Sequence, residues 1–210
     1  MAERDNVTAR PFPIRVFLAS SSAGKLREYR DLARDSALDL DLLPNFRDVV
    51  LFEETAPTFA ENALGKVLYY GRFTDEVVLA EDSGLVVPAL GGAPGVYSSR
   101  YAGPKGTDVN RVEKLLRAMR GKEGRERRAR FVCVIAVAYS GRPLAVVSDF
   151  VEGTITREPR GTSGFGYDPI FMLPGIDRTS AEISHDEKNR ISHRGKALRK
   201  TWDILADSSS

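Results

Sequence analysis

Two adjacent carboxylates, Glu81 and Asp82, are the most telling candidates for chemistry in this chain. They stand in the run VVLAEDSGL, which predicts that they lie at the carboxyl end of a buried strand, where the chain turns at Gly84. Open α/β sheets bind ligands at this end of their strands, and Mg²⁺ binds one or two carboxylates together with phosphate oxygens. One carboxylate could hold a metal ion while its neighbour takes a proton from water. An acidic turn without a catalytic role is an equally common reason for such a pair.

A serine-rich run, SSSAGK at 20–25, separates a strand-like segment from a helix-like one. The first turn of a helix presents unpaired N–H groups and the positive end of its dipole, which together bind phosphate. The hydroxyls add donors, and Lys25 adds a positive charge. The run is not a Walker A loop, because that motif requires Gly at the position of Ala19 and Ser or Thr at that of Leu26. A serine-rich helix cap with a solvated lysine is the alternative interpretation.

A second acidic pair, Glu53 and Glu54, precedes a predicted helix that carries Asn62 and Lys66. Those two side chains are four positions apart, so they share a helix face and can reach one ligand. Helix caps and solvated charges also produce this pattern, and on residue type alone they are the better explanation.

A glycine-dense run, GTSGFGYD at 161–168, suits a turn whose backbone approaches a ligand closely. The rings of Phe165 and Tyr167 could offer a flat apolar face to a base. A tight loop anchored by its aromatic side chains is the alternative.

The segment EKNRISHRG at 187–195 contains His193 and follows His185, the two histidines of the chain. On one straight helix Lys188 and Arg194 would be separated by roughly 240° of rotation and could not face the same ligand. If both do, the chain bends between them, and we expect a break near 191–192. Taken alone, His193 is more typical of a capping or buried histidine than of a catalytic one.

Around these motifs, strand-like and helix-like segments alternate, which predicts an α/β fold with a mixed central sheet flanked by helices. The capping-box pattern at Thr58 and Glu61 predicts the start of one helix, and the two long β-rich runs around Gly141 predict a hairpin. We expect one domain over 14–206, between tails at 1–13 and 207–210. The predicted strands are 14–20, 38–43, 77–80, 130–139, 143–155 and 169–173, and the predicted helices are 24–33, 58–73, 107–120 and the last segment, which carries Ile191, Leu198 and Leu205.

The composition excludes several classes of protein. The chain has 210 residues, 42% of them hydrophobic, which is enough to bury one sizeable core. Thirty-one basic residues against 29 acidic ones give a net charge of +2, so a polybasic nucleic-acid binder is not expected. No stretch approaches the roughly 20 apolar residues of a membrane-spanning helix, and no apolar run follows Arg4 and Arg10 as in a secretory signal. A single cysteine, Cys133, fits a reducing, cytoplasmic setting.

Taken together and in order, these motifs resemble the inosine triphosphate pyrophosphatase family, also called the xanthosine/deoxyinosine triphosphate pyrophosphatases. The resemblance runs from about Ile14 to Ala206. It is carried by LASSSAGKLREY, EETAPTFAENALGK, LAEDSGLVVPALGGAPGVYSSRYAG, GFGYDPIF and EKNRISHRGKAL. It implies Mg²⁺-dependent hydrolysis of ITP, dITP and XTP to monophosphate and pyrophosphate, which keeps these bases out of DNA and RNA. It also implies two lobes with the nucleotide cleft between them, and a homodimer. The balanced charge and the absence of a long apolar stretch predict that neither nucleic acid nor membrane is a partner.

The resemblance also implies roles for individual residues. Asp82 is the proton acceptor, and Glu53, Asp82 and Glu81 contact the metal. The phosphate loop comprises Ser20, Ser21, Ser22, Ala23, Gly24 and Lys25, and the other substrate contacts are Lys66, Ser83, Phe165, Gly166, Tyr167, Asp168, Lys188, His193 and Arg194. Lys188 and Arg194 can only donate hydrogen bonds, so they suit recognition of the 6-keto oxygen of a purine base. A site built from such donors rejects a 6-amino group.

Two segments depart from the family pattern. Members commonly carry Thr-Gly-Asn at 20–22, where this chain has three serines, and a larger apolar residue at Gly65. Glycine inside a helix costs about 0.5–1 kcal/mol relative to alanine. Two rival functions stay open: a pyrophosphatase for other modified nucleotides, and a nucleotide-binding sensor without catalysis.

Overall fold

A six-stranded mixed sheet forms the centre of the protein, as the sequence predicts. The computed structural model describes residues 14–34, 38–46 and 48–207, so the predicted tails lie almost entirely outside it. β1 pairs in parallel with β2 and β3, and all the other pairs are antiparallel. In spatial order the strands are β2 (Leu38–Leu42), β1 (Ile14–Ala19), β3 (Val77–Val86), β4 (Arg128–Tyr139), β5 (Arg142–Ile155) and β6 (Phe171–Met172).

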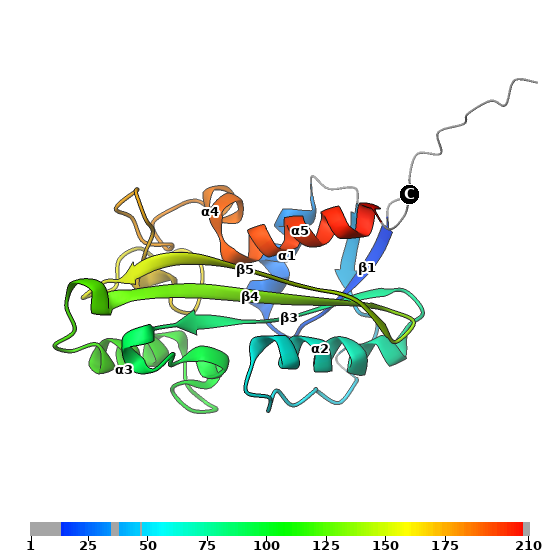
Figure 1. Ribbon diagram of the computed structural model, residues 1–210, viewed down its shortest axis with the longest axis horizontal. Helices are drawn as coiled ribbons and strands as arrows, with labels where there is room; N and C mark the ends of the chain where they lie inside the picture. Colours follow the sequence, from blue (N-terminus) through cyan, green and yellow to red (C-terminus); the bar gives the residue numbers. More distant parts are fainter. Residues whose placement is uncertain (1–13, 35–37, 47, 208–210) are drawn as a thin grey trace, which may run out of the picture.

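Helices cover both faces of the sheet (Figure 1). One face carries α2 (Phe59–Tyr70) and α3 (Asp108–Ala118), and the other carries α1 (Ala23–Ala33), α4 (His185–Ile191) and α5 (His193–Asp207). None of the helices in the described part of the chain has the length and apolar character needed to cross a membrane.

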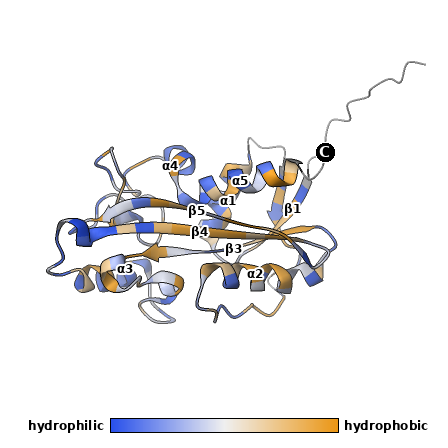
Figure 2. Ribbon diagram, in the orientation of Figure 1, coloured by the Kyte–Doolittle hydropathy of each residue, from blue (hydrophilic) through white to orange (hydrophobic). Residues whose placement is uncertain are grey.

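The core follows the two-residue period of the strands, which sends alternate side chains to opposite faces. Val16 and Leu18 of β1 pack beneath α5, whereas Phe17 and Ala19 belong to the cluster beneath α2. A third cluster lies at the far end of the sheet, where α3 covers Leu85 and Phe131. Figure 2 shows the corresponding apolar band along β4.

β3 is longer than predicted, and this corrects the expected position of the acidic pair. The strand does not end near Ala80 but continues beside β4 to Val86, so Glu81 and Asp82 lie within it. Gly84 therefore sits in a strand and not in a turn. A side chain at Gly84 would collide with the backbone oxygen of Gly95, about 2.6 Å from an added Cβ. This glycine permits the close approach of the 3₁₀ segment η3 (Gly95–Arg100) to the strand.

The predicted break in the last helical segment is confirmed. Ser192 has extended backbone angles, φ −68° and ψ 157°, between α4 and α5. Its N–H donates to the carbonyl of Lys188 at 2.8 Å, and its hydroxyl accepts from the N–H of Gly195 at 3.0 Å. One serine thus ends α4 and caps α5.

Candidate active site

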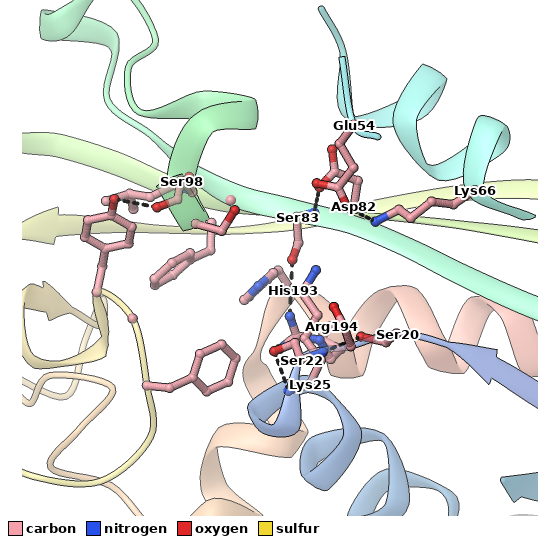
Figure 3. Close-up of a pocket in the computed structure, with 18 of the residues that line it drawn as sticks. Ser20, Ser22, Lys25, Glu54, Lys66, Asp82, Ser83, Ser98, His193 and Arg194 are labelled. Atoms are coloured by element: carbon pink, nitrogen blue, oxygen red, sulfur yellow. Dashed lines mark hydrogen bonds and ion pairs between the residues drawn. The ribbon is translucent and has the colours of Figure 1, made fainter. Parts of the chain in front are cut away.

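A cavity of about 290 Å³ opens beside β3, at the point where β1 ends (Figure 3). β1 pairs with β3 only as far as Ala19 and Ala80, whereas β4 accompanies β3 to Val86. Beyond Ala80, the edge of β3 that faces β1 is therefore unpaired. Side chains from both faces of β3 reach this edge. Glu81 and Ser83 extend toward α5, and Asp82 extends toward α2. This edge explains how consecutive residues of one strand serve one site.

The serine-rich loop forms one wall of the cavity. Ser22 caps α1, accepting from the N–H of Lys25 at 3.4 Å, and the hydroxyl of Ser20 accepts from the N–H of Ser22 at 3.3 Å. The three serines and Lys25 line the cavity, whereas Ala23 and Gly24 do not. The first turn of α1 thus combines helix N–H groups with an ammonium group beside the cavity, as a phosphate site requires.

Asp82 is buried in the opposite wall. Its Oδ2 accepts from Asn62 Nδ2 at 3.0 Å, and its Oδ1 accepts from the N–H of Ser83 at 2.9 Å. Burial raises the pKa of Asp82 to about 6, an effect that the charge of Lys66 opposes and that of Glu54 reinforces. A carboxylate whose pKa lies near neutrality is suited to accept a proton from water.

The second acidic pair is divided by the fold. Glu54 lines the cavity, whereas Glu53 is exposed and lies outside the lining, contrary to its predicted place beside Asp82. Lys66 Nζ lies 2.5 Å from both Glu54 Oε1 and the carbonyl oxygen of Glu81, and Arg100 donates to the Glu54 carbonyl at 2.7 Å. These contacts come from α2, β3 and η3, so they select one of two neighbouring glutamates by tertiary structure.

Beneath the cavity floor, Glu28 of α1 connects the two cations that were expected to read the base. It accepts from Lys188 Nζ at 2.7 Å and from Arg194 Nη1. Burial by itself would raise the pKa of Glu28, but Arg194 and Lys188 lower it to about 2. Glu28 was not predicted as a site residue from the sequence. Its only local signal is its position three residues after Lys25, on the same face of the helix.

Arg194 continues the ion-pair network to the sheet. Its Nη2 donates to Glu81 Oε1 at 2.6 Å, and Lys25 Nζ lies 3.1 Å from the same oxygen. Glu81 is 2% exposed and does not line the cavity. Burial would raise the pKa of Glu81, but Arg194 and Lys25 hold it well below the usual value. Its oxygens are thus occupied by cations, which leaves Asp82 as the member of the pair that faces the cavity.

His193 is buried and neutral. Its ring stacks on Phe131 with a centroid separation of 4.9 Å and an interplanar angle of 11°. Burial lowers the pKa of His193 to about 3, and the charge of Arg194 acts in the same direction. Its Nδ1 has no hydrogen-bond partner among the described residues, although the side chain lines the cavity.

The glycine-dense segment lines the cavity on the side away from Lys66 (Figure 3). The Phe165 ring lies 5.1 Å from Lys188 Nζ and 5.7 Å from the guanidinium of Arg194, and Tyr167 donates to the Ser98 carbonyl at 2.9 Å. Asp168 accepts from Lys188 at 2.5 Å. All predicted residues of this segment line the cavity: Phe165, Gly166, Tyr167 and Asp168. Two further lining residues, Asp108 and Arg111, were not predicted, because nothing local to α3 indicates a site.

Known proteins resemble this chain over nearly its whole length. A model of the Ham1 family matches residues 16–204. The dITP/XTP pyrophosphatase of Geobacillus kaustophilus is 48% identical over 185 residues, covering 88% of this chain and 91% of the relative. That of Bacillus licheniformis is 45% identical over 190 residues, covering 90% and 97%. A solved HAM1 protein from Coxiella burnetii has a TM-score of 0.81 at 44% identity, covering 92% of this chain and 99% of that one.

Proposed function

The chain belongs to the Ham1 family, and from this premise we propose that it hydrolyses non-standard purine nucleoside triphosphates, dITP and XTP among them, to monophosphate and pyrophosphate. One observation carries the proposal beyond the names of the relatives. A single cavity joins a helix N-terminus with Lys25, a buried carboxylate with a raised pKa, and an aromatic side chain beside two cations. These are the parts needed to hold phosphates, activate water and contact a base.

Mg²⁺ is the proposed cofactor, and the donor set fits it. No group of three or more His, Cys, Asp or Glu side chains in the described residues could hold a metal ion alone. Glu54 and Asp82 nevertheless both line the cavity, and the charge of Glu54 contributes to the raised pKa of Asp82. Mg²⁺ is commonly held by one or two carboxylates, with phosphate oxygens and water completing its shell. We therefore assign the metal contact to Asp82 and Glu54, in place of the exposed Glu53. When bound, the ion would neutralise phosphate charge.

In the proposed reaction Asp82 takes a proton from the attacking water as a bond to phosphorus forms and the anhydride bond breaks. Asn62 and the N–H of Ser83 fix both oxygens of Asp82, so its orientation is set before substrate binds. Lys25 and Lys66 stand on opposite sides of β3 and can neutralise a triphosphate from two directions (Figure 3). Phosphoryl transfer depends chiefly on such positioning and charge stabilisation.

Selection of the base is assigned to Lys188, Arg194 and His193, which line the end of the cavity beside Phe165. Glu28 holds both cations, so their donors are oriented in advance. A 6-keto oxygen accepts from such donors, whereas a 6-amino group leaves them unpaired. Alanine at Arg194 would leave Glu28 and Glu81 buried without this partner, so a substrate series tests selectivity more cleanly than truncation does.

The experiment is pyrophosphate release from dITP, XTP, ITP, ATP, GTP and a modified pyrimidine triphosphate, with Mg²⁺ and with excess chelator. We expect turnover of dITP, XTP and ITP to exceed that of ATP by at least 10-fold, and to require the metal. Binding without pyrophosphate release would favour a sensor. A preference for the pyrimidine would favour the other house-cleaning function.

We further propose a homodimer in a reducing, cytoplasmic setting. Val146 and Phe150 are about half exposed and share one face of β5, and the half-exposed Leu144 lies beside them at an irregularity of the strand pairing. A second copy would cover this apolar strip. Cys133 is free and buried, as suits a reducing compartment. Light scattering of the wild type and of Val146→Glu tests the dimer. A monomeric wild type would contradict it.

A further inference from the structure

A carboxylate at the start of α3 reaches the glycine-dense segment that lies 58 residues further along the chain. Asp108 Oδ2 accepts from the N–H of Gly166 at 2.8 Å, and both residues line the cavity. Gly166 has a left-handed backbone, with φ +64°. In this turn the N–H of Gly166 takes no part in strand pairing, and Asp108 of another element satisfies it.

Asp108 is itself held by Arg111, one helical turn later. Arg111 Nη2 pairs with Asp108 Oδ1, and Arg111 Nη1 donates to the carbonyls of Ser99 and Gly106, both at 2.7 Å. Burial would raise the pKa of Asp108, but the Gly166 N–H and Arg111 lower it. The group is thus a carboxylate at neutral pH. A free carboxylate in the wall of a triphosphate cavity would repel the substrate, and Arg111 offsets that charge.

The contact falls on the residue that follows Phe165. On its other side, the N–H of Phe165 donates to Asp168 Oδ2 at 2.9 Å. The backbone of Phe165 is therefore fixed at both of its ends, by Asp168 from within the segment and by Asp108 from α3. The Asp168 contact is local, whereas the Asp108 contact ties the Phe165–Gly166 peptide to α3.

We propose that Asp108 is a positioning residue that fixes Phe165 against the base and so sets the KM for the nucleotide. The inference rests on the proposed function only in assigning the Phe165 ring to the base. Asp108 acts on binding, because it lies beside the base end of the cavity and not beside Asp82. Loss of Asp108 loosens the Phe165–Gly166 peptide and leaves the chemical step intact.

The test compares Asp108→Ala, Asp108→Asn and the control Glu113→Ala, an exposed acid on the same helix. A hydrogen bond to a charged group contributes about 1.5–3 kcal/mol, so Asp108→Ala should raise the KM for dITP about 10-fold or more. Its kcat should stay within about twofold. The asparagine oxygen still accepts from the N–H of Gly166, so the KM of Asp108→Asn should stay close to that of the wild type. In a Phe165→Ala background, Asp108→Ala should add little, because the two residues act in series.

Amide hydrogen exchange of the peptide 161–168 provides a readout that does not require turnover. Exchange should accelerate in Asp108→Ala and stay unchanged in Asp108→Asn and Glu113→Ala. A wild type without activity on any purine triphosphate would refute the proposed function, while exchange would still test the contact. An unchanged or lowered KM in Asp108→Ala would overturn the inference, since it would mean that the Gly166 N–H serves the ligand. Equal losses with Phe165 present and absent would also overturn it.

Discussion

The side-chain amide of Asn62 binds the Asp82 carboxylate and the backbone of Ala56 at the same time. Its Nδ2 donates to Asp82 Oδ2 at 3.0 Å and to the Ala56 carbonyl at 3.2 Å, and its Oδ1 accepts from the Ala56 N–H at 3.0 Å. Asn62 is fully buried. The segment that carries Glu54 is thereby tied to the strand that carries Asp82, and Asn62 joins Lys66 in fixing the separation of the two carboxylates.

This arrangement predicts a pH effect for Asn62→Asp. A second buried carboxylate beside Asp82 disfavours its ionised form and raises its pKa above the value of about 6. Since a general base works deprotonated, activity is lost as pH falls through its pKa. The acid limb of the kcat/KM profile should therefore move to higher pH by about one unit or more. An acid limb at the wild-type position would show that Asp82 is not the group titrating there.

Asp82→Asn tests the base directly. The change is nearly isosteric, so the fold and nucleotide binding should persist, whereas kcat should fall by about 10²–10⁴-fold. Calorimetric binding of dITP and single-turnover rates separate the two effects. Retention of more than about a tenth of wild-type kcat would assign proton transfer to another group.

Glu54 and Glu53 form a matched pair for the metal assignment. Glu54→Gln removes a cavity carboxylate, and the apparent activation constant for Mg²⁺ should rise about 10-fold or more. Glu53→Gln alters an exposed neighbour and should leave that constant within about twofold. Calorimetric titration of Mn²⁺ into each variant gives a second reading. The opposite ranking would restore Glu53 as the ligand.

The low pKa of buried His193 predicts that the protein becomes less stable in mild acid. The folded-state pKa of about 3 lies below the unfolded value of about 6.5, so the unfolded chain binds the proton first. This contribution to stability is complete above pH 6.5 and is lost as pH falls toward 3. Between pH 7 and pH 5 the His193 contribution to the free energy of unfolding should drop by about 2 kcal/mol. Urea denaturation of His193→Gln should show a shallower pH dependence, whereas exposed His185→Gln should follow the wild type.

Helix propensity favours alanine over glycine at position 65, but the packing of Phe52 opposes this change. A Cβ at this position would lie 2.6 Å from Cζ of Phe52, so the ring must shift to admit alanine. In an open helix the change would stabilise by about 0.5–1 kcal/mol, but overpacking costs about 1–3 kcal/mol. Gly65→Ala should therefore destabilise the protein by about 1 kcal/mol. The same change in a Phe52→Leu background should stabilise it. Thermal unfolding of the four proteins decides the matter, and a gain in the wild-type background would contradict the clash.

Most elements of the fold were predictable because their signals are local. The Thr58 cap, the turn at Gly141 and the break at Ser192 each depend on a few adjacent residues, and each is confirmed. The predicted end of β3 was wrong, because the polar side chains in the second half of this strand suggest a turn. Pairing with β4, set some 50 residues away, keeps that half extended.

The site was predictable as a set of segments but not as a set of contacts. Fourteen of the predicted residues do line one cavity, yet the choice between Glu53 and Glu54 depends on Lys66 and Arg100, which arrive from other elements. Glu28 escaped notice because its partners are 160 and 166 positions away. A glutamate in an ordinary amphipathic helix gives no indication of such distant cations.

The shared partners of Glu28 have a consequence for sequence variation. Lys188 and Arg194 both bind Glu28, and Arg194 also binds Glu81, so each buried charge depends on more than one other. Removal of a single member leaves an uncompensated charge away from water, and the effects of such changes do not add. We expect these residues to be inherited as a block across relatives, with replacements that occur together or not at all. Drift one position at a time should be confined to the surface around them.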